Sequence, residues 1–199
     1  MEKQVERFKL EFPTKAREED AMDFLREFIE VNTVIHGSGG FDLYMDDYDG
    51  WLDHLEEDRD REPTEQRVPA ETFFLVRESD DKIVGIISIR KVLNRALWNF
   101  GGNIGYSIRP SERRKGYNKI NLFLGLCVCK NRGIEAVLIS CEKRNIASAK
   151  SIQALGGKLL YEYMDDELGY EIQNYVIDVR YALDKFGDKY APMMLEYPA

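Results

Sequence analysis

The chain has 199 residues, of which 44% are apolar and 12% aromatic, and its formal net charge at pH 7 is −8. This length and composition predict an ordinary globular protein with one sizeable core. The longest apolar run, 122–129, is too short to cross a bilayer, and the charged segment 1–7 is unlike a signal peptide. We therefore expect a cytoplasmic protein with no membrane partner. The sequence also lacks a recognisable nucleic-acid-binding motif, so we expect no nucleic-acid partner.

Metal-ligating residues are scarce. Three cysteines make no disulfide framework and are expected to be reduced and mostly buried. With only two histidines beside them, the sequence predicts no metal site. Segment 45–56 nearly fits an EF-hand loop, but Met45 stands where that loop needs Asp, so calcium binding is not expected.

Apolar periodicity predicts one domain with the element order β-α-α-β-β-β-α-β-α-β-β. The strands are expected over residues 5–12, 71–76, 82–90, 102–108, 136–140, 158–164 and 170–179. The first helix is expected to bury Ala21, Phe24, Leu25, Phe28 and Ile29, and the others cover 46–58, 117–131 and 145–155. Residues 1–180 form the predicted domain, and residues 181–199 a C-terminal extension of unknown role.

The most informative segment is 102–118. A strand-like run stops at Pro110, and the turn 113–118 then leads straight into an apolar helix. Gly116 lets backbone N–H groups turn toward a ligand. The helix that begins near Tyr117 adds its unpaired amides and the positive end of its dipole. This arrangement predicts a site for a pyrophosphate.

Basic residues surround this turn in an otherwise acidic chain. The group comprises Arg109, Arg113, Arg114, Lys115 and Lys119 around one acid, Glu112. Such a cluster favours a bound anion, although a solvated basic turn before a helix would give the same pattern. Neither G-x-x-x-x-G-K-[ST] nor G-x-G-x-x-G occurs, which argues against P-loop and Rossmann sites.

The turn resembles the acyl-CoA-binding signature of the GNAT superfamily of N-acetyltransferases, [RQ]-x-x-G-x-[GA]. Here it reads Arg113-Arg114-Lys115-Gly116-Tyr117-Asn118, with Asn118 where the family usually has Gly or Ala and Arg114 where a second Gly is common. The order of elements over about 4–180 also resembles the family's. The resemblance implies an α/β (α+β) fold with a mixed, mostly antiparallel central sheet, splayed middle strands and helices on both faces.

A second patch, 145–148, resembles the family's Asn-x-x-[AS] helix start. Asn145 can cap the helix or offer its amide to the thioester end of a CoA arm, and Ser148 can hydrogen-bond that arm. Many family members carry a tyrosine seven residues after this Asn, as the acid that protonates the leaving thiolate. Here that position is Ile152. The proton for the thiolate would then come from solvent, from Tyr161 or from Tyr163, or no acid would take part.

The resemblance implies transfer of an acetyl group from acetyl-CoA, as cosubstrate, to a small-molecule amine by direct attack on the thioester. Backbone N–H groups near Tyr106 and Ile108 would hold the pantetheine arm and polarise the carbonyl. The implied cofactor-binding residues are Tyr106, Ile108, Arg113, Arg114, Lys115, Gly116, Tyr117, Asn118, Asn145 and Ser148. The candidate catalytic residues are Asn145, Asn103 and Tyr106, without an assigned base, although strand Asn and Tyr are more often core or edge residues.

The acidic stretch 42–62 falls where the family builds its acceptor pocket, and Asp46 and Asp47 could attract a cationic amine. A solvated helix face is the alternative for most of these acids. The loop 37–40 is interpreted as a mobile lid over the acceptor. A homodimer is compatible with the sequence. Two other functions stay open: a GNAT-like module that binds CoA or another anion without turnover, and an interaction domain that uses the acidic face and the C-terminal tail.

Overall fold

The computed structural model describes residues 5–166 and 169–199, and it contains two antiparallel sheets. The first sheet has the order β1-β2-β3-β4, with β1 Phe8–Glu11, β2 Ala70–Arg77, β3 Lys82–Arg90 and β4 Ile104–Ile108. The second has the order β5-β7-β6, with β5 Ala136–Glu142, β6 Lys158–Asp165 and β7 Tyr170–Asp178. All five strand ladders in the described part of the chain are antiparallel, and the expected class of fold is confirmed.

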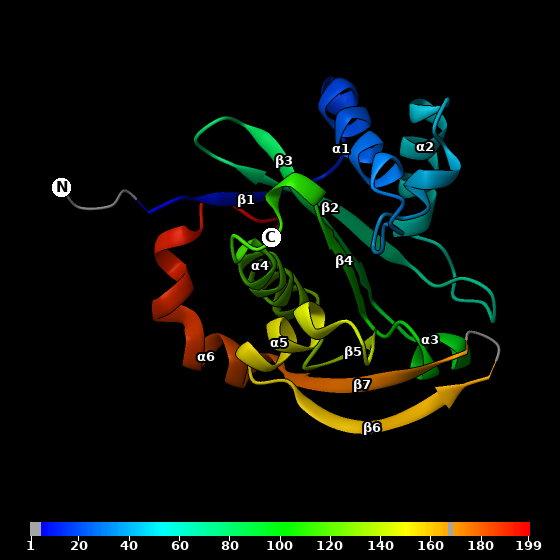
Figure 1. The fold of residues 1–199 in the computed structure, drawn as a ribbon, viewed down its shortest axis with the longest axis vertical. Helices are drawn as coiled ribbons and strands as arrows, with labels where there is room; N and C mark the ends of the chain where they lie inside the picture. Colours follow the sequence, from blue (N-terminus) through cyan, green and yellow to red (C-terminus); the bar gives the residue numbers. More distant parts are fainter. Residues whose placement is uncertain (1–4, 167–168) are drawn as a thin grey trace.

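Helices cover both faces of the first sheet (Figure 1). The helices are α1 Glu18–Glu30, α2 Tyr48–Arg59, α3 Arg95–Asn99, α4 Tyr117–Asn131, α5 Ile146–Ala154 and α6 Val179–Tyr190. Helices α1 and α2 lie on one side, whereas α4 lies on the other side with α5 and α6 beside it. The seven predicted strands and four predicted helices are all present. The short helix α3 and the C-terminal helix α6 were not predicted.

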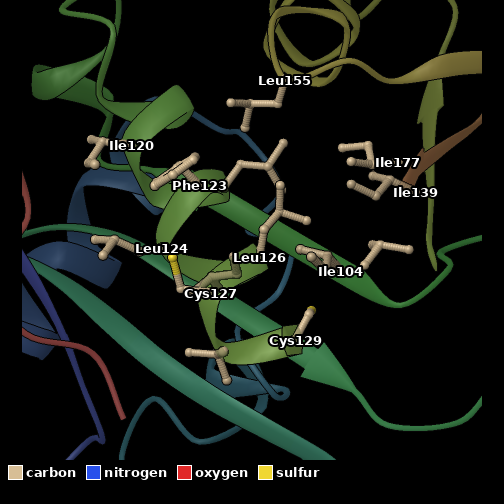
Figure 2. Close-up of a cluster of buried hydrophobic side chains, with 14 of the residues drawn as sticks. Ile104, Ile120, Phe123, Leu124, Leu126, Cys127, Cys129, Ile139, Leu155 and Ile177 are labelled. Carbon is tan, nitrogen blue, oxygen red and sulfur yellow. The ribbon is translucent and has the colours of Figure 1, made fainter. Parts of the chain in front are cut away.

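The apolar faces of these layers form two clusters, which explains why α4 is buried almost all round. One cluster joins α1 and α2 to the sheet through residues such as Phe24, Trp51 and Phe74. The other encloses α4, and Figure 2 shows its side chains reaching in several directions toward the strands and α5. Cys127 and Cys129 are therefore both buried, as free thiols.

One residue of the predicted α1 face behaves differently. Ala21, Phe24, Leu25 and Phe28 are buried, as expected, but Ile29 is 52% exposed. Ile29 lies on the last turn of the helix, at the margin of the apolar stripe. The prediction for Ile29 is wrong because periodicity does not show how far along a helix its partner layer extends.

The two sheets meet at one end of β4 and separate from there. Gly102 bridges Ile139, and a Cβ at Gly102 would collide with the Leu138 carbonyl group. Asn103 donates its backbone N–H to the Leu138 oxygen (2.7 Å), and its Oδ1 accepts from the Leu138 N–H (2.9 Å). Its Nδ2 also donates to the Arg90 oxygen (3.2 Å). Beyond this junction β4 and β5 share no ladder, so the expected splay is confirmed.

The C-terminal segment packs on the body of the protein. Helix α6 lies against α4, where the rings of Tyr190 and Phe123 stack with centroids 4.9 Å apart. The residues after α6 then run beside β1, and the Leu10 N–H donates to the Glu196 oxygen (2.9 Å). The division expected at residue 180 falls inside α6, which joins the extension to the core.

Candidate active site

The turn before α4 presents a row of unpaired backbone amides. Gly116 is the N-cap of α4 with φ +86°, and no side chain caps the helix. Within the described chain, the N–H groups of residues 114–118 find no acceptor. A Cβ placed on Gly116 would meet nothing within 4 Å, so the turn is open on the side where that Cβ would lie. Aligned N–H groups at a helix N-terminus bind phosphate well, and the predicted cradle therefore has the geometry for a diphosphate.

Arg109 does not belong to the basic cluster, contrary to prediction. The residue is only 4% exposed, and its side chain donates to Glu27 (2.6 Å), Asp20 (3.0 Å) and the Ile83 oxygen (3.0 Å). Burial opposes ionisation of Glu27, but hydrogen bonds from Arg109 and Ser111 outweigh it and lower the Glu27 pKa. Arg109 thus ties the end of β4 to α1, and its charge is neutralised there.

Glu112 also removes positive charge from the turn. It is 5% exposed and accepts from Arg77 (2.7 Å) and Lys115 (2.7 Å). Arg113 is exposed, with its guanidinium 5.4 Å from the ring centre of Phe28. The described residues offer no acid partner to Arg113 or Arg114, or to Lys119 one turn further along. These three are the cations left for an anion.

The splayed strands turn backbone groups toward each other across the gap. The Arg109 N–H donates to the Val84 oxygen, so the backbone N–H and C=O groups of the odd-numbered residues of β4 point toward β3. The backbone groups of Tyr106 and Ile108 therefore point away from β3, into the gap. On β5, the Lys143 N–H donates to the Glu171 oxygen of β7. By the same alternation, the backbone groups of the even-numbered residues of β5 point away from β7, into the gap. An extended arm could therefore lie along β4 and bond its free edge.

Polar side chains gather where α5 begins beside β4. The Tyr106 hydroxyl contacts Ser148 Oγ at 2.9 Å, and burial raises the pKa of Tyr106 to about 12. Asn145 caps α5 by accepting from the Ser148 N–H (3.1 Å), as predicted, and its side chain is exposed. Asn118 Oδ1 is buried and has no partner among the described residues. The structure thus brings Tyr106, Asn118, Asn145 and Ser148 to one end of the gap.

No acid takes the place of the missing tyrosine on α5. Ile152 is fully buried in the core. The hydroxyl groups of Tyr161 and Tyr163 donate to the oxygens of Trp98 (3.3 Å) and Asn99 (3.1 Å), so both are engaged at α3. Asn103 is likewise engaged, because both ends of its amide bond backbone groups at the junction.

A cavity of about 760 Å³ lies on the α2 side of β3 and β4. Its lining combines residues 35–40 and 42–44 of a loop, His54 and Asp58 of α2, residues 66–68 and 70, Ser88 and Arg90 of β3, and residues 94, 96 and 97. The loop is held against β4, since the His36 N–H donates to Ser107 Oγ (2.8 Å) and a Cβ on Gly37 would collide with the Gly105 carbonyl group. The cavity thus opens beside the middle of β4.

The predicted acidic residues contribute little to this cavity. Asp46 and Asp47 do not line it, and Asp47 instead caps α2 by accepting from the Gly50 N–H (2.9 Å). Asp58 lines it but bonds Arg61 (2.8 Å) and Arg67 (3.2 Å). Asp42 is the remaining acid of the lining, and within the described chain it has no cationic partner.

His36 is a functional candidate that the sequence analysis did not assign. His36 is one of the lining residues and is exposed, and its imidazole makes no hydrogen bond to the described residues. Burial lowers the pKa of His36, and the nearby carboxylates of Glu142 and Asp42 offset this only partly. A neutral imidazole beside β4 can accept a proton at neutral pH. The only sequence signal was a lone histidine directly before a glycine-rich loop.

The described residues contain no group of three or more His, Cys, Asp or Glu side chains placed to hold a metal ion. None of the helices over these residues has both the length and the apolar character needed to span a bilayer.

Comparisons with known proteins agree with the fold. Residues 13–158 match the model of the acetyltransferase (GNAT) domain. The ribosomal-protein-S5-alanine acetyltransferase of Vibrio fischeri has a TM-score of 0.64 at 13% identity, over 88% of this chain and 95% of that one. The microcin C7 self-immunity acetyltransferase MccE, solved with acetyl-CoA and AMP, has a TM-score of 0.61 at 14% identity, over 86% of this chain and 92% of that one. YncA of Salmonella typhimurium, solved with its cofactor acetyl-CoA, has a TM-score of 0.59 at 14% identity, over 86% of this chain and 94% of that one. No curated protein matches the sequence.

Proposed function

The chain belongs to the GNAT acetyltransferase family, and we propose that it transfers an acetyl group from acetyl-CoA to the amine of a small molecule. One observation carries the proposal. The unpaired amides of residues 114–118 lie at the start of α4, next to the gap along which β4 leaves its backbone edge free. A diphosphate joined to a long, thin arm matches this pair of features, and the similarity to MccE and YncA, solved with acetyl-CoA, supports the same ligand.

The proposed binding mode uses each part of the site differently. The amides of 114–118 hold the diphosphate, helped by the charges of Arg113 and Arg114. The pantetheine arm runs beside β4 and bonds the main chain of Tyr106 and Ile108. At its thioester end the arm meets the side-chain amide of Asn145. The Oδ1 atom of this amide accepts the capping bond, and its Nδ2 makes no hydrogen bond in the described structure.

The proposed reaction is direct attack of a neutral amine on the thioester carbonyl. The amine nitrogen forms a bond to the carbonyl carbon, and the negative charge that develops on the oxygen is stabilised by a β4 backbone N–H. The carbon–sulfur bond then breaks, and the thiolate takes a proton from solvent. Tyr106 is a poor proton donor for this step, since burial raises its pKa to about 12. We assign Tyr106 to positioning, and we leave Asn103 out of the catalytic group because its amide is fully used at the sheet junction.

His36 is the proposed general base. It faces the cavity beside β4, and its lowered pKa keeps the imidazole neutral and able to take the proton that the amine loses. A His36→Gln variant should therefore bind acetyl-CoA normally and lose about 10²- to 10⁴-fold in kcat. A variant that retains wild-type turnover would exclude His36 as the base.

The first experiment is calorimetric titration with acetyl-CoA, with desulfo-CoA and ATP as controls for a generic anion site. We expect micromolar binding that is selective for the CoA compounds over ATP. Thiol release in the presence of an amine panel then tests turnover. Absence of acetyl-CoA binding would contradict the proposal.

A non-catalytic CoA-binding module is the second candidate. The buried Ile152 favours it, because the usual proton donor of the family is missing at that position. This alternative predicts tight acetyl-CoA binding with no amine-dependent thiol release, so the same two measurements separate the candidates.

A further inference from the structure

Arg90 is a half-buried cation without a carboxylate partner among the described residues. It is the last residue of β3 and lines the 760 Å³ cavity. Its Nη1 donates to the Gly102 oxygen (3.0 Å), which is the one hydrogen bond that its guanidinium makes to the described chain. Arg77, Arg109 and Arg132, by contrast, each pair with at least one acid.

An unpaired guanidinium in such a place is unfavourable in the empty protein. Removal of a charge from water costs free energy that a nearby opposite charge or hydrogen bonds must offset. Burial lowers the pKa of Arg90, but an arginine side chain does not lose its proton in a protein. Most of the N–H donors of Arg90 thus remain available, and an oxyanion in the cavity would satisfy them in pairs.

The same cavity carries one free acid. Asp42 is exposed and has no ion-pair partner within the described chain, whereas Asp58, the other acid of the lining, is shared between Arg61 and Arg67. Among the charged side chains that line the cavity, Arg90 and Asp42 are thus the two without an ion-pair partner in the described part of the chain. That combination does not match a simple polyamine, because Arg90 would repel a second ammonium group.

We propose that the acceptor is a zwitterionic small molecule, an amine that also carries a carboxylate or phosphate. The Arg90 guanidinium binds the oxyanion, Asp42 attracts the ammonium form, and His36 takes a proton from the amine before or during attack. This inference rests on the proposed acetyl transfer. It replaces the expectation of a purely cationic acceptor with one that has both charges.

The test compares acceptors that differ only in the acid group. The panel consists of free L-amino acids, their amides, aminoalkyl phosphates and polyamines, each assayed for thiol release from acetyl-CoA. We expect kcat/KM to be highest for acid-bearing amines and to fall about 10- to 100-fold for the matched amides, the range of a lost charge-assisted bond. The relative rates of carboxylates and phosphates identify which oxyanion the site takes.

Variants connect this preference to Arg90. Arg90→Gln keeps an N–H₂ donor on a shorter side chain but lacks the charge, and it should lose the preference for acids while acetyl-CoA affinity stays unchanged. Arg90→Lys should keep part of it. Lys91→Gln is the matched control, because it removes the same charge one residue away, where Lys91 does not line the cavity. It should behave like the wild type.

A readout without acetyl-CoA separates failure of the inference from failure of the proposed function. Acid-bearing amines should raise the melting temperature of the wild-type protein alone, and should raise that of Arg90→Gln much less. Equal shifts in the two proteins, equal turnover of acids and amides, or turnover of polyamines alone would each overturn the inference. Loss of acetyl-CoA binding in the wild type would instead contradict the proposed function and leave the melting-temperature result as the test of the pocket.

Discussion

Gly116 and Gly133 lie at opposite ends of α4 and allow a controlled test of the diphosphate cradle. Both have positive φ, +86° and +71°, and a Cβ at either position would meet nothing within 4 Å. Alanine at either site therefore introduces backbone strain without a steric clash. A residue with a Cβ pays about 1 to 2 kcal/mol for this left-handed conformation.

The two substitutions should express that strain differently. At the C-terminus of α4 the conformation is held by hydrogen bonds, from the Gly133 N–H to the Lys130 oxygen (3.1 Å) and from the Ile134 N–H to the Cys129 oxygen (2.9 Å). Gly133→Ala should thus lower the free energy of unfolding by about 1 to 2 kcal/mol and leave ligand binding unchanged. No described group bonds the N–H of Gly116, so in Gly116→Ala the turn can relax to negative φ and displace its amides.

Restoring the left-handed turn in the complex would then cost about 1 to 2 kcal/mol of binding free energy, a Kd increase of about 5- to 30-fold. Calorimetric titration with acetyl-CoA measures the Kd, and urea unfolding measures stability, for both variants and the wild type. If Gly116→Ala bound acetyl-CoA as tightly as the wild type, the turn would not be the diphosphate site. The same conclusion would follow if Gly133→Ala weakened binding equally.

Other predictions concern three side chains. Arg109→Met should lower the free energy of unfolding by about 2 to 4 kcal/mol, less than for a fully buried pair, because the acids left behind, Asp20 and Glu27, are partly exposed. Urea unfolding checks this, and a loss below about 1 kcal/mol would mean that the pair is solvated. Asn145→Asp should keep the cap and the stability but reduce turnover, since Asp lacks the N–H₂ donor; full activity would leave Asn145 with capping alone. For His36, the folded pKa lies below the ordinary histidine value of 6.5, so the folded state binds fewer protons than the unfolded chain near that value. Its contribution should destabilise the fold as pH falls through 6.5. With His36 as the base, kcat/KM should rise with pH along a limb whose midpoint lies below 6.5; a His36→Gln profile with the same limb would refute this.

Local signals predicted the turn and the start of α4 well. Pro110, Gly116 and the apolar run after Tyr117 act on the backbone within a few residues, and the structure begins α4 at the predicted residue. The cap at Asn145 is equally local, since its acceptor and donor are three residues apart.

The roles of charged residues were harder to predict, because they depend on partners far away in the chain. Arg109 resembles its basic neighbours in sequence, yet its partners on α1 lie 82 and 89 residues away. Arg90 and His36 are far apart in the sequence, and they line the same cavity only in the folded chain. Helix α6 was missed because the strand-like pattern of β7 continues up to its first residue, where Asp178 caps the helix.

The junction at Asn103 also bears on how the protein avoids unwanted association. A strand edge with unpaired N–H and C=O groups invites pairing with other chains, and proteins usually cover, shorten or charge such edges. Here the free edge of β4 faces β5 across a gap that is closed at one end by the bonds between Asn103 and Leu138. An extended polypeptide carries side chains on both faces and needs the space of a full strand, whereas an unbranched arm needs less. The splay can therefore keep a backbone template in place for a thin ligand while it hinders another protein from using it.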